Sequence, residues 1–168
     1  MKALFTTVGQ WHDRVFSLIS HAQSPFLLLV RIYWGWQLWQ SGWGKLHNLD
    51  KVIDFFASLS IPAPAQMAVF IACVEFFGGI LFALGAFSRV ISLILTVNLT
   101  MAYILADREA LFSIFSDPDK FIAAAPFNFL VASLIVLIFG AGHICVDRAI
   151  THLAEVRGAK QIQRSPAV

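Results

Sequence analysis

Charged side chains are scarce in this sequence. Only 13% of its 168 residues are Asp, Glu, Lys or Arg, whereas 58% are hydrophobic. A typical soluble domain has about 25% charged residues. So few charges could not keep that much apolar surface in solution, which excludes a soluble enzyme and a disordered chain. The net charge of +2 is too small for a nucleic-acid-binding surface, so no nucleic-acid partner is expected. The class that remains is a membrane domain.

Cysteine is also scarce, and the placement of cysteine and histidine excludes several kinds of site. Cys73 and Cys145 form no CxxC pair and have no zinc-binding spacing. We expect them at different membrane depths, too far apart for a disulfide. The five histidines form no pair in a metal-like or haem-like setting, so no metal site is predicted. The sequence assigns no catalytic residue.

Four largely uncharged stretches are each close to the roughly 20 residues that a helix needs to cross a ~30 Å hydrocarbon core. They cover residues 25–44, 64–86, 88–106 and 123–142. Prolines near their starts and glycines near their ends are typical of helix boundaries. The sequence therefore predicts an all-α fold, an integral membrane four-helix bundle over residues 25–147.

The segments outside these spans carry helical patterns of their own. Apolar residues in segment 1–24 are spaced by four and three, which predicts an amphipathic helix on the inner membrane surface. The longer connections, 46–62 and 107–122, contain clustered apolar residues and are predicted to form short interfacial helices. Residues 148–168 are polar and are expected to be a cytoplasmic tail.

The distribution of Lys and Arg predicts how the bundle is oriented. With four spans, both termini and the short turn at 86–88 share one side of the membrane. That side carries seven Lys and Arg residues and the other side four. Because positive residues are enriched in cytoplasmic segments, we expect both termini in the cytoplasm of a bacterial cell with the protein in its inner membrane.

Polar residues within the predicted spans are candidates for a functional site, since they are costly in lipid. Arg31, Gln37, Glu75 and Asn98 form the candidate buried polar site. Two interpretations remain open for Arg31 and Glu75. They could form a structural ion pair, or Glu75 could carry a proton or accept a hydrogen bond from a buried ligand, with Arg31 tuning its pKa.

Small residues accompany the polar ones on the same helix faces. Gly35 and Gly42 share a stripe with Arg31, and Gly78 and Gly79 share a face with Glu75. Glycines on such faces allow helix backbones to approach closely, or they leave space for a ligand. We favour close packing around a small polar pocket.

The polar and glycine positions follow one another in an ordered set of motifs. These are Arg31 followed by Gly42-Trp43-Gly44-Lys45, then Glu75-Phe-Phe-Gly78-Gly79 with Leu84-Gly85 and Arg89, then Gly140-Ala-Gly142-His-Ile-Cys-Val-Asp147. In this order they resemble the DoxX family of small bacterial four-helix membrane proteins.

The resemblance implies a location and a role. The location is the inner membrane, and the role is that of an accessory subunit of a quinone-linked redox or oxidative-stress assembly. The residues themselves show no evident cofactor, and quinone is the candidate that the resemblance offers. Whether the chain is itself an enzyme stays open. The alternative is a non-catalytic scaffold or assembly factor; a small transporter is weaker. The expected partners are the lipid bilayer and a membrane or periplasmic protein or a second copy of the chain.

Overall fold

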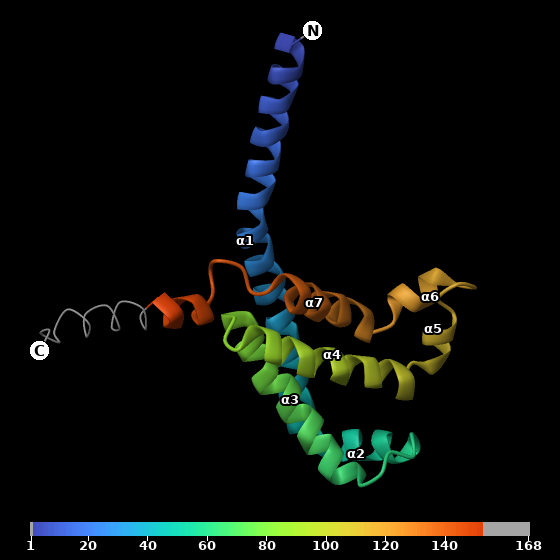
Figure 1. The fold of residues 1–168 in the computed structure, drawn as a ribbon. Coiled ribbons are helices and arrows are strands. Elements are labelled where there is room, and N and C mark those ends of the chain that lie inside the picture. The colour runs from blue at the N-terminus through green and yellow to red at the C-terminus, as the bar shows by residue number, and fades with distance from the viewer. Residues whose placement is uncertain (1, 153–168) are drawn as a thin grey trace, which may run out of the picture.

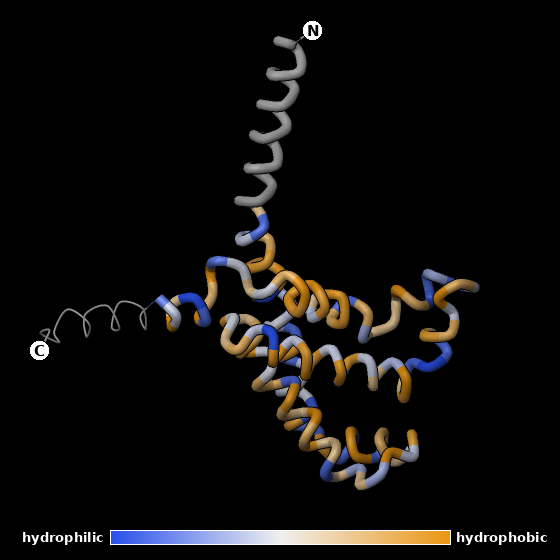
Figure 2. The backbone as a smooth tube through the Cα atoms, in the orientation of Figure 1, coloured by the Kyte–Doolittle hydropathy of each residue, from blue (hydrophilic) through white to orange (hydrophobic). Residues whose placement is uncertain are grey.

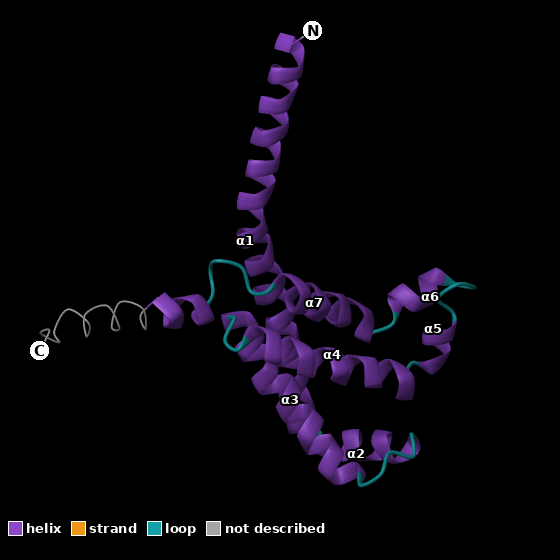
Figure 3. Cartoon of the chain, in the orientation of Figure 1, coloured by secondary structure: helices purple, strands orange, loops and turns teal. Residues whose placement is uncertain are grey.

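Helices joined by short loops make up the regular structure of this protein (Figures 1 and 3). The structure is a computed structural model that describes the backbone of residues 2–152 and the side chains of residues 22–152. The helices are α1 (Lys2–His47), α2 (Leu49–Ser58), α3 (Pro64–Leu84), α4 (Ser88–Leu105), α5 (Arg108–Phe112), α6 (Pro118–Ala123) and α7 (Pro126–Phe139). Residues 146–152 are also helical, and the described residues contain no strand. The all-α prediction is confirmed.

Two helices, α3 and α4, are long and apolar enough to cross a membrane, judged by length and composition alone. Their bounds agree within two residues with the predicted spans 64–86 and 88–106. The other two predicted spans lie in different kinds of helix. Residues 25–44 belong to α1, where Arg31 and Gln37 lower the mean hydropathy. The span predicted at 123–142 corresponds to α7, which is apolar but has only 14 residues.

Helix α1 differs from the expectation of a separate N-terminal helix ending before Pro25. It runs without a break for 46 residues, with Pro25 in its interior. Proline removes one backbone hydrogen-bond donor, but the leucine run that follows favours helix, and α1 does not end there. The apolar stripe predicted within segment 1–24 depends on side chains outside the described ones, and the tail beyond residue 152 also lies outside the described residues.

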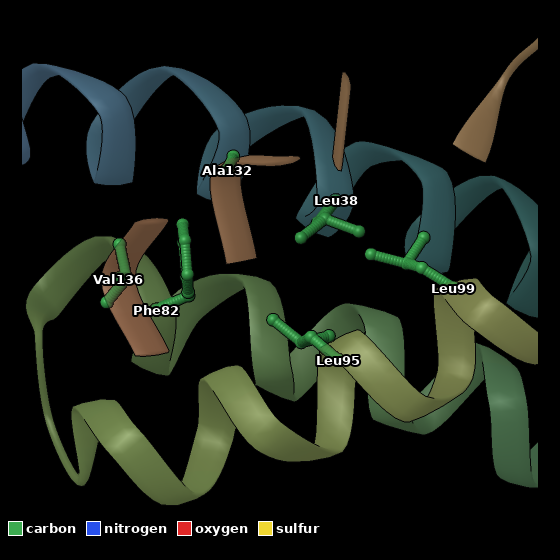
Figure 4. Close-up of a cluster of buried hydrophobic side chains, with 6 residues drawn as sticks. All are labelled: Leu38, Phe82, Leu95, Leu99, Ala132 and Val136. Atoms are coloured by element: carbon green, nitrogen blue, oxygen red, sulfur yellow. The ribbon is translucent and has the colours of Figure 1, made fainter. Parts of the chain in front are cut away.

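The core lies where four helices meet. Helix α1 packs mainly on α3, and α4 packs mainly on α7. Leucine, phenylalanine, valine and alanine side chains from all four fill the space between them (Figure 4). The buried members of this cluster are Leu38, Phe82, Leu95, Leu99, Ala132 and Val136. Hydrophobic residues recur along α3, α4 and α7 (Figure 2), and several of them have exposed side chains, such as Phe77, Val97 and Ile138.

Short helices occupy both of the longer connections, as predicted. Helix α2 joins α1 to α3 and has no buried residue. Helices α5 and α6 join α4 to α7, and Phe112 and Phe115 in this connection are exposed. Apolar side chains exposed on short helices are typical of segments at a membrane interface.

Candidate functional site

Helices α1 and α3 approach each other at glycines. A Cβ atom added to Gly35 would lie 2.7 Å from the backbone oxygen of Gly79, and one added to Gly79 would lie 2.5 Å from the backbone nitrogen of Trp39. A Cβ atom on Gly42 would lie 2.7 Å from Cα of Phe76. Because real Cβ atoms essentially never come within 3.0 Å of such neighbours, only glycine fits at these three positions.

Gly78 faces a different neighbour from Gly79. A Cβ atom on Gly78 would lie 3.2 Å from a side-chain atom of Leu95 on α4. The adjacent glycines of α3 therefore serve two contacts, Gly79 with α1 and Gly78 with α4. A flexible leucine side chain can yield more readily than backbone, so the Gly79 contact is the tighter constraint.

Beside the glycine contact lies a buried carboxylate. Glu75 on α3 accepts a hydrogen bond from the Ser41 hydroxyl, with the two oxygens 2.8 Å apart. Its other carboxylate oxygen forms an ion pair with the Lys45 ammonium. The side chain of Glu75 is 7% exposed and that of Lys45 is 30% exposed, so the pair connects the helix interface to the exterior through Lys45.

The local geometry of α1 explains why these two residues reach Glu75. Ser41 and Lys45 are four residues apart, so they lie on one face of the helix. Side chains on a helix lean toward its N-terminus, so Lys45, near the C-terminal end of α1, leans back along the helix. Gly42, between them in sequence, allows the close approach to α3 at Phe76, the neighbour of Glu75.

Arg31 and Glu75 do not form the ion pair that was one of the two interpretations of these residues. The Arg31 side chain is fully buried, and its Nη2 donates to the backbone oxygen of Ile144 at 2.5 Å. Its Nη1 lies against Gly85. Gly85 follows Glu75 by ten residues, about 15 Å along a helix at 1.5 Å per residue. The spacing of residues along α1 gives no depth relative to α3, so it could not tell which basic residue meets Glu75.

Arg31 belongs to a second polar cluster, where the loop after α7 meets the start of α4. The Nε and Nη1 atoms of Arg31 have no hydrogen-bond partner among the described residues. Nearby, the Asp147 carboxylate accepts hydrogen bonds from the N–H groups of Phe87 and Ser88, at 2.7 and 2.9 Å, and from the Ser88 hydroxyl at 2.7 Å. Asp147 thus caps the N-terminus of α4, where negative charge is favourable.

These contacts determine the ionisation of Asp147. Partial burial raises its pKa, but the hydrogen bonds from Ser88 and Phe87 and the positive charge of Arg31 lower it. The net result is a pKa below the ordinary value for aspartate. The carboxylate is therefore ionised at neutral pH and supports the fold in that form.

The remaining two members of the predicted polar site, Gln37 and Asn98, are half-buried. Neither contributes a side-chain hydrogen bond to Glu75 or to Arg31 among the described contacts. The structure therefore divides the predicted set, with Glu75 in one cluster and Arg31 in another. Ser41 and Asp147 were not proposed as partners from the sequence. The i, i+4 spacing of Ser41 and Lys45 was the available signal for the first.

Glu75 does not line either of two cavities that lie between the described helices. One is an open groove of about 1120 Å³ beside the start of α4. The other is a recess of about 260 Å³ between α3 and α4 with an entirely apolar lining that includes Cys73 and Gly78. Two aromatic residues, Trp43 and Phe76, are close in sequence to Lys45 and Glu75. Trp43 is half-exposed, and its ring centre lies 5.8 Å from that of Phe76.

Comparison with known proteins links the chain to one family. The family model described as DoxX matches residues 26–108. A curated relative, "Putative oxidoreductase CatD" of Bacillus subtilis (strain 168), is 26% identical over 122 residues. The match covers 71% of this chain and 83% of the relative. No solved structure matches significantly. The matched segment contains α3, α4 and the Glu75 cluster with its partners Ser41 and Lys45.

Proposed function

Because this chain belongs to the DoxX family of membrane proteins, we propose that it is an accessory subunit of a redox assembly in the bacterial inner membrane. The word oxidoreductase in the name of the Bacillus relative supports the redox part of this proposal. The exposed hydrophobic side chains of α3, α4 and α7 support the membrane part, since such side chains are stable against lipid. Electrons would pass through the partner proteins and the quinone pool.

Four crossings are part of the proposal. Helices α3 and α4 supply two of them by length. Residues 25–44 of α1 pack antiparallel to α3 along most of its length and supply the third. The fourth is α7, which at 14 residues spans about 21 Å at 1.5 Å per residue and needs its flanking residues or local thinning to cross. The excess of Lys and Arg beside the termini supports the proposal that both termini are cytoplasmic.

The observation that carries the functional proposal is the Glu75 cluster. A quinone head offers carbonyl oxygens and a flat ring, so it needs hydrogen-bond donors and aromatic or apolar surface. Lys45 uses one of its three N–H donors on Glu75, and its side chain is 30% exposed. The half-exposed Trp43 and its neighbour Phe76 are close in sequence to Lys45 and Glu75. Lys45 could therefore donate to the carbonyl oxygen of a quinone that approaches from the lipid side.

The roles of the residues follow from their chemistry. Lys45 would bind the head group through its free donors. Glu75, which accepts from both Lys45 and Ser41, would hold the Lys45 ammonium in place for the head group. A quinone, when bound, supplies two-electron redox chemistry coupled to protons.

A scaffold is the second candidate function, and one observation favours it. Both carboxylate oxygens of Glu75 are bonded by α1, and Glu75 lines neither the groove beside α4 nor the recess between α3 and α4. In that case the cluster fixes the register of α1 against α3, and the exposed faces bind a partner protein. Polar groups are well attested in this register-fixing role.

Quinone titration separates the two candidates. The purified full-length protein is titrated with the short-chain ubiquinone-1, and binding is followed by the shift in thermal unfolding. The double variant Lys45→Met/Glu75→Gln removes both charges together, which avoids leaving one buried alone. Lys51→Met, in the exposed helix α2, is the matched control. We expect saturable binding by the wild type and the control, weakened about tenfold or more in the double variant, the loss expected for a hydrogen bond to a charged group.

Two results would favour the scaffold instead. The first is a wild-type protein with no saturable response to the quinone. The second is a double variant that keeps native helix content and binds as tightly as the wild type.

A further inference from the structure

The open groove near the start of α4 takes no part in the function proposed above. It has a volume of about 1120 Å³ and is bounded by residues 87–90, by the loop after α7 and by the helical residues 146–152. Figure 1 shows that loop leaving α7 and leading to the short helix beside the start of α4. The loop turns at Gly140 and Gly142, both with positive φ, and is tied to α1 by the hydrogen bond from His143 N to the Ser24 hydroxyl at 2.9 Å.

The charge of this groove is predominantly positive. Arg89 and Arg148 line it and are exposed, and His143 and His152 line it as well. The one acidic lining residue is Asp147, whose carboxylate already accepts three hydrogen bonds at the start of α4. Behind the wall at Ile144 lies the buried Arg31, with two unpartnered nitrogen atoms among the described residues. The groove is therefore a cationic site with no available carboxylate to neutralise it.

Apolar side chains surround the same charges. Phe87, Val90 and Ile144 line the groove and are all more than half exposed. A groove that combines exposed arginines with exposed apolar side chains fits a molecule with an anionic head and hydrocarbon chains. A free anion would not cover the apolar side chains of the groove, and a soluble acidic peptide would leave most of them exposed to water.

Charge also argues against two occupants from the protein itself. Residues 153–168 contain two Arg and one Lys but a single Glu, so the charge of this segment has the same sign as that of the groove. A second copy of the chain would bring its own cationic groove to the contact if the two met face to face. Complementarity therefore favours an anionic lipid over either.

We propose that the groove between the start of α4 and the loop after α7 binds an anionic glycerophospholipid. The phosphodiester pairs with Arg89 and Arg148, and the acyl chains lie along Phe87, Val90 and Ile144. The lipid would join the first turn of α4 to the segment after α7. The proposal rests on insertion of the chain in a membrane and is independent of quinone binding.

The test uses the purified full-length protein in a neutral detergent. Its thermal unfolding midpoint is measured against short-chain phosphatidylglycerol, short-chain phosphatidylcholine and inorganic phosphate, for the wild type, for Arg89→Gln/Arg148→Gln and for Arg108→Gln. Arg108 is an exposed arginine at α5, outside the groove, and is the matched control. We expect a saturable upward shift with phosphatidylglycerol alone, and about 30-fold weaker apparent affinity in the double variant, the loss expected for two arginines beside an anionic lipid. The Arg108 variant should respond like the wild type.

Each contrary result overturns the proposal in its own way. An equal shift of the unfolding midpoint with phosphatidylcholine would mean that binding does not depend on the charge of the head group. An equal shift with inorganic phosphate would assign a free anion site. A double variant that binds like the wild type, or an Arg108 variant that loses as much, would place the lipid elsewhere. Failure of membrane insertion would show separately, as wild-type protein that does not partition into vesicles of either lipid.

Discussion

Substituting Gly42 by alanine should separate α1 from α3. The added Cβ atom would meet only backbone, lying 2.7 Å from Cα of Phe76 and 2.8 Å from the oxygen of Ala72, so no side chain can rotate away to make room. The two helices must move apart by roughly half an ångström or more, and overpacking of this kind costs about 1–3 kcal/mol. Alanine gains up to about 1 kcal/mol over glycine in a helix. We expect a net loss of about 1–2 kcal/mol.

The neighbouring Gly44→Ala is the matched control. A Cβ atom at Gly44 would meet nothing within 4 Å, so the helix gain stands alone and this variant should be stabilised by about 0.5–1 kcal/mol. Both variants are compared with the wild type by thermal unfolding in detergent, followed by helix content. Equal stabilities of the two variants, or a stabilised Gly42→Ala, would refute the close approach of α1 and α3 at this point.

Two further predictions concern the polar cluster that contains Asp147 and the topology of the chain. Asp147→Asn keeps one acceptor oxygen but removes the negative charge at the start of α4, so it should lower stability by about 0.3–1 kcal/mol, with the exposed Asp54→Asn as the unchanged reference. Because the folded-state pKa of Asp147 is depressed, its contribution should be complete above the unfolded value of about 3.9 and fall as the pH drops through the lower folded value. A pH series of unfolding midpoints in which wild type and Asp147→Asn keep a constant gap down to pH 2 would contradict it. Reporter fusions to the C-terminus should be active in the cytoplasm, and periplasmic activity would reverse the proposed orientation.

The sequence predicted the helices better than the contacts between them. Proline at 64 and glycine at 85 enclose the apolar run of α3, and both of its ends lie within two residues of the prediction. The apolar spacing after Leu49 predicted α2 in the same way. The family resemblance, drawn from ordered glycines and charges, is confirmed. These features are local, so a single sequence contains the signal for them.

The partner of Glu75 depended on information that no local pattern holds. Arg31 and Lys45 both lie on the stripe of α1 that faces α3, so helical spacing admits either as the counter-charge. The axial offset between the helices decides, and the contacts of Gly42 with Phe76 and of Gly35 with Gly79 set that offset. The capping of α4 by Asp147 was hidden for a similar reason, because the two are about 59 residues apart in sequence.

A pair of double-mutant cycles tests most directly the claim that Lys45, and not Arg31, neutralises Glu75. Unfolding free energies are measured for Glu75→Gln, Lys45→Met and Arg31→Met, and for the two double variants that contain Glu75→Gln. We expect a coupling of about 0.5–3 kcal/mol between Lys45 and Glu75, with each single substitution lowering the unfolding free energy more than the double substitution does. For Arg31 and Glu75 we expect the effects of the two substitutions to add within about 0.5 kcal/mol. Additive Lys45 and Glu75 changes, with strong coupling of Glu75 to Arg31, would contradict it.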